Sequence, residues 1–289
     1  MMKKVKINDY EYLEYSYRTG DNFHKIRKKV NEELDLEKLK LELLMEIFRT
    51  RWGKDIKKLG ENYKDQFCSL PKPIQGKNLH NFGVQFTHNT NKIEGSSLSL
   101  KDVVEIINDG VTPSHKPLKD VFEAKKHMDL YEQICHEPFE ISWDRVLNWH
   151  KILFHETKHS IAGTFRDYPV GIAGSKYTPP MGLAIIEIEL ERLLKFWRKN
   201  KKRLHPVLLA CLMHLRFVTI HPFGDGNGRI SRLLMNFILY HSNFPMFDIP
   251  AKYRRTYYNA LERSNLKNDE SVFLQWFMRN YLKVNKKYL

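Results

Sequence analysis

The chain has 289 residues, 42% of them hydrophobic, and its 48 Lys and Arg against 34 Asp and Glu give a formal net charge of +14. This is enough for one large domain, or for one domain with a smaller helical extension. No apolar run approaches about eighteen residues, so we expect no transmembrane helix and no membrane partner. Residues 1–10 lack the apolar block of a secretion signal. The three cysteines (Cys68, Cys135 and Cys211) have no metal-ligand spacing, so we expect a reducing, cytoplasmic location.

Much of the positive charge lies in short runs at 25–29, 57–58 and 198–203. Such runs are usually solvated helix faces, so we do not expect a nucleic-acid partner. Salt-sensitive binding to unrelated DNA would contradict that expectation.

In chain order, residues 1–75 read as a charged N-terminal helical region. Leu36, Leu39, Leu43 and Ile47 have helical spacing there, and Pro71, Pro73 and Gly76 predict a break. Helices over 84–95, 98–110 and 118–136 form a second region, 76–140. Residues 141–289 form a third, with helices near 141–157, 184–200, 206–220, 227–241, 250–265 and 269–283. The fold is therefore all-α.

The first helix of the second region carries Thr90-Asn91-Lys92-Ile93-Glu94-Gly95. Thr90 and Glu94 are four residues apart and share one helix face. Gly95 is a natural helix stop.

Residues 155–159 read His-Glu-Thr-Lys-His, which matches the short zinc-protease motif. The longer form of that motif fails because Ala162 stands where Gly is required. We therefore keep a zinc protease only as a minor alternative. Residues 163–180 are punctuated by Gly and Pro with apolar residues at short spacing, which predicts a small β-hairpin.

The stretch His221-Pro222-Phe223-Gly224-Asp225-Gly226-Asn227-Gly228-Arg229-Ile230-Ser231-Arg232 is the most informative of the chain. It joins two predicted helices, so the loop N–H groups and the positive end of the second helix face one point and form an anion site. Asp225 can hold a metal that bridges phosphates, and arginines at 229 and 232 supply forked donors. His221 is the group here able to take a proton near neutral pH. The P-loop and Rossmann patterns do not fit.

This stretch resembles the signature of the Fic (Fido) domain protein adenylyltransferases, His-Pro-Phe-x-Asp-Gly-Asn-Gly-Arg-x-x-Arg, at every fixed position. The resemblance runs from about residue 81 to the C-terminus. It implies a helical core with a hairpin flap, and transfer of AMP from ATP to a hydroxyl side chain of a target protein. His221 would be the general base, and Asp225 would hold Mg²⁺. Gly226, Asn227 and Gly228 would form the anion hole, with Arg229 at the β-phosphate and Arg232 at the γ-phosphate.

The resemblance also implies regulation. Thr90 to Gly95 fits the family's inhibitory pattern, in which Glu94 would pair with Arg232 and displace the γ-phosphate. The hairpin at 163–180 would be the flap that receives the target's backbone as an added strand, with Lys176 and Tyr177 near the nucleotide. Tyr257 and Tyr258 would border adenine and ribose, and Asn265 would contact the base.

Several points stay open at this stage. Relatives tune their inhibitory helices by dimer contacts, so the chain is a monomer or a homodimer. Transfer of another group, such as UMP or phosphate, is the nearest rival function. A basic interaction protein on an inactive Fic scaffold is the rival from another class.

Overall fold

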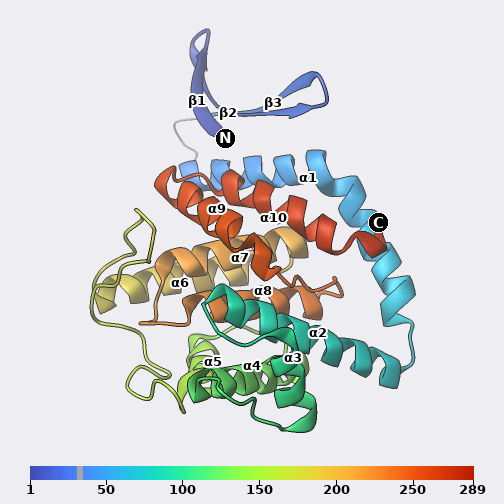
Figure 1. Ribbon diagram of the computed structural model, residues 1–289. Coiled ribbons are helices and arrows are strands. Elements are labelled where there is room, and N and C mark those ends of the chain that lie inside the picture. The colour runs from blue at the N-terminus through green and yellow to red at the C-terminus, as the bar shows by residue number, and fades with distance from the viewer. Residues whose placement is uncertain (31–34) are drawn as a thin grey trace.

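The computed structural model describes residues 1–30 and 35–289, and it is mostly helical (Figure 1). The expected all-α core is confirmed. Its helices are α1 (Leu36–Tyr63), α2 (Lys72–Ile93), α3 (Leu100–Val104), α4 (Leu118–His136), α5 (Trp143–Phe154), α6 (Leu183–Asn200), α7 (Pro206–Ile220), α8 (Asn227–His241), α9 (Arg254–Leu266) and α10 (Glu270–Val284).

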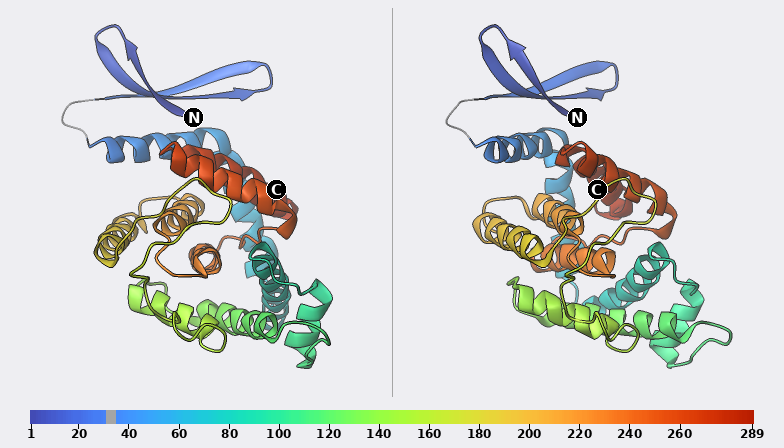
Figure 2. Two further views of the ribbon diagram at one scale, coloured as in Figure 1. Left: turned by 60° about the vertical axis from the view of Figure 1, so that its left-hand side comes forward. Right: turned by 90° about the vertical axis from the view of Figure 1, so that its left-hand side faces the viewer.

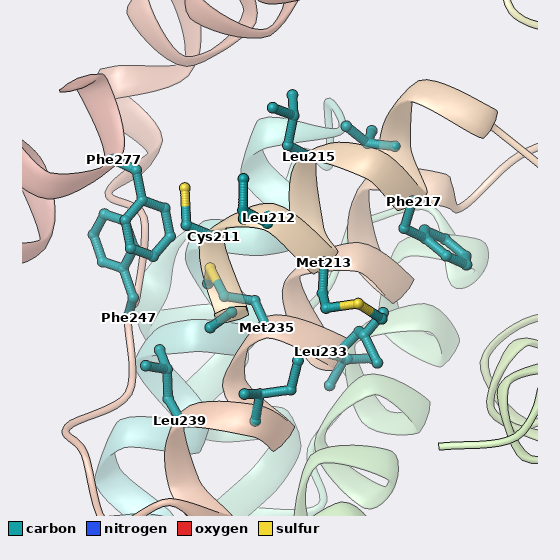
Figure 3. Close-up of a cluster of buried hydrophobic side chains, with 14 of the residues drawn as sticks. Cys211, Leu212, Met213, Leu215, Phe217, Leu233, Met235, Leu239, Phe247 and Phe277 are labelled. Carbon is teal, nitrogen blue, oxygen red and sulfur yellow. The ribbon is translucent and has the colours of Figure 1, made fainter. Parts of the chain in front are cut away.

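Helix α7 is the centre of the core. Every one of its residues except Pro206, Arg216 and Thr219 is buried. A helix that is apolar all round belongs in the interior, surrounded by other elements. Figure 3 shows part of this packing, where side chains of α7 meet those of α8, α10 and the 244–250 segment. The loop that leaves the C-terminal end of α7 is therefore held on a fixed base.

The N-terminus differs from the helical region expected over 1–75. Strands β1 (Met2–Ile7), β2 (Tyr10–Thr19) and β3 (Asn22–Lys29) form an antiparallel sheet in the order β1-β2-β3. Two-residue turns connect them, and Asn8 and Gly20 adopt positive φ at 53° and 58°. Such turns favour Asn and Gly because positive φ matches the twist of the strands. The helical expectation holds from α1 onward, and residues 31–34 of that region lie outside the described residues.

The sheet lies on the side of α1 that faces away from the other helices (Figure 2). On its opposite side, α1 packs against α10. The described part of the chain has no helix with the length and apolarity needed to cross a membrane.

The β-hairpin expected over 163–180 is not formed. These residues are an irregular loop between α5 and α6, without strands. Proline has no N–H to donate to a strand pair, and this loop contains Pro169, Pro179 and Pro180. The guanidinium of Arg166 holds it instead, by donating to the carbonyls of Tyr168 (2.8 Å) and Pro180 (2.7 Å). The expected break at 71–76 also shifts, because α2 begins at Lys72 and includes Pro73 in its first turn.

Candidate functional site

The loop between α7 and α8 is fixed by its own side chains. The Asn227 amide accepts from the N–H of Phe223 at 2.9 Å and donates to its carbonyl at 2.8 Å. Gly226 has φ of 80°, and a Cβ there would overlap the ring of Phe154. Glycine adopts this conformation without strain. The backbone therefore enters α8 in one defined geometry.

His221 ends α7 with φ of 53° and ψ of 56°, a left-handed conformation that is uncommon for a residue with a side chain. Its Nδ1 lies 3.2 Å from the carbonyl of Val218. Assigning the ring proton to Nδ1 leaves Nε2 with a free lone pair. Burial lowers the pKa of His221 below its ordinary value, so the ring is neutral at neutral pH. A neutral ring with a free Nε2 can accept a proton.

Asp225 lies in a charged cluster with Glu123 of α4, Arg229 of α8 and Lys158 of the segment after α5. Its Oδ2 accepts from Lys158 Nζ at 2.7 Å, and its Oδ1 lies 3.9 Å from Arg229 Nη2. Glu123 on α4 binds the same lysine at 2.9 Å and also pairs with Arg229. Burial favours the neutral form of Asp225, but the Lys158 hydrogen bond and the Arg229 charge outweigh it and lower the pKa. The carboxylate is therefore ionised and can bind a cation.

The donor set at Asp225 fits a magnesium ion held together with phosphates. Mg²⁺ binds hard oxygen ligands and commonly takes one or two carboxylates plus substrate phosphates. The side chain of Asp225 is 46% exposed, so one carboxylate reaches the open side of the loop. Within residues 1–30 and 35–289, no group of three His, Cys, Asp or Glu could hold a metal alone. An ion here would depend on the bound nucleotide for its other ligands.

Arg232 is fully buried, and its guanidinium is directed at the end of α2. Its Nε donates to Thr90 Oγ1 at 2.7 Å, and its Nη2 donates to the Thr90 carbonyl at 3.2 Å and to Glu94 Oε1 at 2.5 Å. Burial works against the charge of Arg232, but the Glu94 carboxylate raises its pKa. The ion pair expected between Glu94 and Arg232 is therefore present.

The Glu94 carboxylate also covers the start of α8. A Cβ built on Gly228 would overlap Glu94 Oε1. Gly228 is in the first turn of α8, where backbone N–H groups have no helical partners and attract anions. The Glu94 carboxylate thus lies at the positive end of α8 and also binds the Arg232 guanidinium. Gly95, with φ of 99°, ends this segment as expected.

The remaining candidate residues lie in two places. The hydroxyl of Tyr177 donates to the Thr219 carbonyl at 3.3 Å, and Asn265 Oδ1 accepts from Thr219 Oγ1 at 2.8 Å. Both line a cavity of about 880 Å³ beside α7. The N–H of Lys176 donates to Glu262 at 2.6 Å.

The tyrosine pair lies nearer Arg232. Tyr257 is fully buried, with its hydroxyl 3.0 Å from His214 Nε2 and 3.5 Å from Arg232 Nη1. The hydroxyl of Tyr258 is 3.5 Å from Glu94 Oε2. Only Tyr258 therefore has a side chain at the open side of the Glu94–Arg232 pair.

Sequence reasoning missed four residues that position this site. Glu123 and Lys158 hold Asp225 and Arg229, as described above. Arg166 donates from Nε to the His221 carbonyl at 2.8 Å. The buried His150 has Nε2 3.0 Å from the Asp225 carbonyl and accepts from the Gly163 N–H at 2.9 Å, and burial lowers its pKa to about 4. Of these four residues, Glu123 alone could have been suspected from the sequence. It is a charged residue among the apolar positions of its helix, and such residues are seldom buried unless they are paired.

The zinc-protease alternative is not supported by the geometry. His155 follows the last residue of α5, and residues 156–162 are mostly turns, so His155 and His159 do not share a helix. Their rings lie 5.0 Å apart, edge to face. They belong to no group of three metal-binding side chains among the described residues.

Comparisons with known proteins find relatives over the part of the chain that contains this loop. Residues 140–239 match the Fic/DOC family. The protein adenylyltransferase Fic of Drosophila ananassae is 31% identical over 185 residues, which cover 63% of this chain and 37% of that protein. Its counterpart in Drosophila melanogaster is 32% identical over 177 residues, covering 60% of this chain and 35% of that protein. The chain thus spans a little over a third of the length of these curated relatives.

Solved structures share the fold. A Fic domain containing signaling protein from Bacteroides thetaiotaomicron superposes with a TM-score of 0.72 and 25% identity, covering 81% of this chain and 94% of that one. Fic-1 of C. elegans, residues 134–508, gives a TM-score of 0.70 and 24% identity, covering 89% and 78%. The motif at 221–232, the helical core around it and these likenesses agree on one point: residues 140–239, which contain the loop, are similar to the Fic/DOC family.

Proposed function

We propose that this chain is a protein adenylyltransferase, which transfers AMP from ATP to a hydroxyl side chain of a target protein and releases diphosphate. One observation carries the proposal. A single loop brings a neutral imidazole, an ionised carboxylate and the start of α8 together, with two arginines next to them. The curated relatives named protein adenylyltransferase Fic support the same reaction.

In the proposed reaction His221 is the general base. The target hydroxyl oxygen bonds to the α-phosphorus, the bond from that phosphorus to the diphosphate oxygen breaks, and Nε2 takes the hydroxyl proton. The hydrogen bond from Nδ1 to Val218 supports this tautomer. The N–H groups at Gly226, Asn227 and Gly228 would stabilise the charge that develops on the phosphate oxygens.

Asp225 would hold Mg²⁺ against the nucleotide, and the ion would neutralise phosphate charge. Its ionised carboxylate and its exposure support this role. Lys158 would have to leave Oδ2, which is the oxygen it binds here. Arg229, held by Glu123, would contact the β-phosphate region, and Arg232 the γ-phosphate.

Glu94 would be an inhibitor built into the same chain. Its carboxylate holds the guanidinium assigned to the γ-phosphate and covers the start of α8. ATP would then bind weakly or in a non-productive pose.

The outlying residues complete the proposed nucleotide site. Tyr177 and Asn265 line a cavity beside Thr219 whose lining includes none of residues 221–232. Their proposed place near the base, like that of Lys176, therefore rests on the family resemblance. Tyr258 would border the ribose, while the buried Tyr257 supports Arg232. The target's backbone would dock along the 163–180 loop. The free thiols Cys68, Cys135 and Cys211 support a reducing, cytoplasmic location.

The test is incubation of the Glu94→Gly protein with each nucleoside triphosphate labelled at the α-phosphate, followed by mass spectrometry. We expect AMP on hydroxyl side chains, with loss of transfer in a Glu94→Gly/His221→Ala variant of unchanged thermal stability. Transfer of UMP, or transfer that survives His221→Ala, would contradict the proposal.

A further inference from the structure

The N-terminal sheet has an inner face that is already occupied. Leu13, Tyr15 and Ile26 are buried there. The hydroxyl of Tyr15 accepts from Arg51 Nη1 of α1 at 2.6 Å. This face attaches the sheet to the helical body.

The opposite face carries strong positive charge. Residues directly opposite one another in an antiparallel pair project to the same side, so Lys3, Glu14 and Arg27 share this outer face. We define the outer face as the odd-numbered residues of β1 and β3 and the even-numbered residues of β2. No described element packs on it, and the views in Figures 1 and 2 agree. Lys25, Arg27 and Lys29 of the run at 25–29 therefore lie on this uncovered face, whereas Lys28 lies on the inner face and pairs with Glu46 of α1. The run is not the helix face expected from the sequence.

Five cations lie on the outer face: Lys3, Arg18, Lys25, Arg27 and Lys29. Among the described residues of this face, Glu14 is the one carboxylate, and it is only 2% exposed.

Glu14 organises part of this charge. It lies 2.8 Å from Arg27, 3.5 Å from Lys3 and 3.8 Å from Lys25, so it gathers three cations and neutralises one charge. The face keeps a net charge of four without any covering partner.

Aromatic side chains lie beside some of these cations, at the two ends of the outer face. Tyr10, which is 52% exposed, and Tyr12 lie near Lys29 at one end of the face. Phe23, which is 59% exposed, lies opposite Arg18 at the other end. Lys29 Nζ lies 3.2 Å from the centre of the Tyr10 ring. Exposed aromatic rings next to cations give flat surfaces on which bases can stack, while the cations contact phosphates.

We propose that the outer face binds a single strand of nucleic acid. Charge complementarity selects a polyanion, and the exposed rings favour one whose bases are unstacked and free to lie on them. The ten residues of β2 extend about 34 Å at about 3.4 Å each, which is long enough for several nucleotides. This activity is separate from AMP transfer and does not depend on it.

The test uses the full chain and fluorescent polyuridine, polythymidine and duplex DNA over ~50 to ~200 mM salt. We expect both single strands to bind with a slope of log affinity against log salt of about −3, from four net charges at about −0.7 each. Arg18→Gln/Lys29→Gln should reduce the slope by about half. Both residues lie away from Glu14, so its ion pairs stay intact. A matched control, Lys57→Gln/Lys58→Gln on α1, should leave the slope unchanged.

A second variant isolates the stacking. Tyr10→Ala/Phe23→Ala removes two exposed rings and no charge, so binding should weaken at least tenfold with the slope preserved. Far-UV circular dichroism checks that the sheet persists. The proposal is overturned if the strands do not bind or if the outer-face variants bind like the control. Equally tight binding of the duplex, or of phosphatidylserine vesicles, would also overturn it.

Discussion

Glu94 is the residue whose removal should change activity and stability in opposite directions. Its carboxylate binds a fully buried guanidinium at 2.5 Å, while a quarter of its own side chain is exposed. A hydrogen bond between charged groups contributes about 1.5–3 kcal/mol. Because solvent screens the exposed part of Glu94, the lower half of that range applies here.

Glu94→Gly and Glu94→Gln both release Arg232 for a phosphate. ATP must replace the Glu94–Arg232 interaction, which contributes about 1.5–2 kcal/mol. Since each tenfold change in affinity corresponds to about 1.4 kcal/mol, removing Glu94 should tighten productive ATP binding by roughly 10- to 30-fold. The same change leaves a buried charge with only Thr90 as a strong partner, so the melting temperature should fall by roughly 3–6 °C. Saturating ATP should restore part of that loss by mass action.

The assay is auto-AMPylation with α-labelled ATP, alongside thermal unfolding with and without nucleotide. Glu61→Gln is the matched control, because Glu61 is an exposed carboxylate that pairs with Lys57 at 3.9 Å. Unchanged transfer in both Glu94 variants would refute the inhibitory role. A fall in both transfer and stability would mean that Glu94 supports the fold and does not block the site.

Two further predictions concern metal and pH. Asp225→Ala should lower AMP transfer by at least ~100-fold and remove its dependence on Mg²⁺, and a rate that still rises with Mg²⁺ would contradict the ligand role. Burial lowers the pKa values of His150 and His205 to about 4 and of His214 to about 3, so the folded protein binds these protons less tightly than the unfolded chain. Their stabilising contribution is complete above pH ~6.5 and is lost as the pH falls toward ~4, at about 1.4 kcal/mol per unit for each histidine. Burial raises the pKa of Asp248 to about 7, so its contribution to the free energy of unfolding increases as the pH falls. This offsets the loss from one of the three histidines. Urea unfolding at pH 7 and pH 5 checks this, and equal free energies would show that the histidines do not control acid stability.

The helices around the loop could be predicted from the sequence because local chemistry sets their ends. Helices expected near 118–136, 206–220 and 227–241 match α4, α7 and α8. Pro117 and Pro206 mark two of the starts, and a Gly-rich loop separates the last two. The helical spacing of apolar residues between these ends predicted the helices themselves.

The supporting contacts could not be predicted, because they join residues far apart in the chain. Glu123 and Arg229 are 106 positions apart, and no local pattern links them. The expected hairpin at 163–180 was wrong because Gly and Pro mark irregular loops as readily as turns. The N-terminal sheet was missed although Leu13, Tyr15 and Tyr17 alternate with Glu14, Ser16 and Arg18, which is the pattern of a half-buried strand. The high Lys and Arg content of this region was interpreted as a charged helical region.

The backbone that we propose binds phosphate is already formed in this structure. Asn227 fixes the loop from within, and Phe154 packs where a side chain at Gly226 would lie, so neither contact needs to change when a phosphate binds. The contact at Gly228 is different, because the group that packs against this glycine is the Glu94 carboxylate, which is itself an anion. A donor array that needs no reorganisation stabilises developing charge most effectively, and it also binds an internal carboxylate well. Under the proposed function, the geometry that would suit this loop to phosphate transfer would therefore also make it easy to inhibit, and the Glu94 carboxylate at the end of α2 would be sufficient to do so.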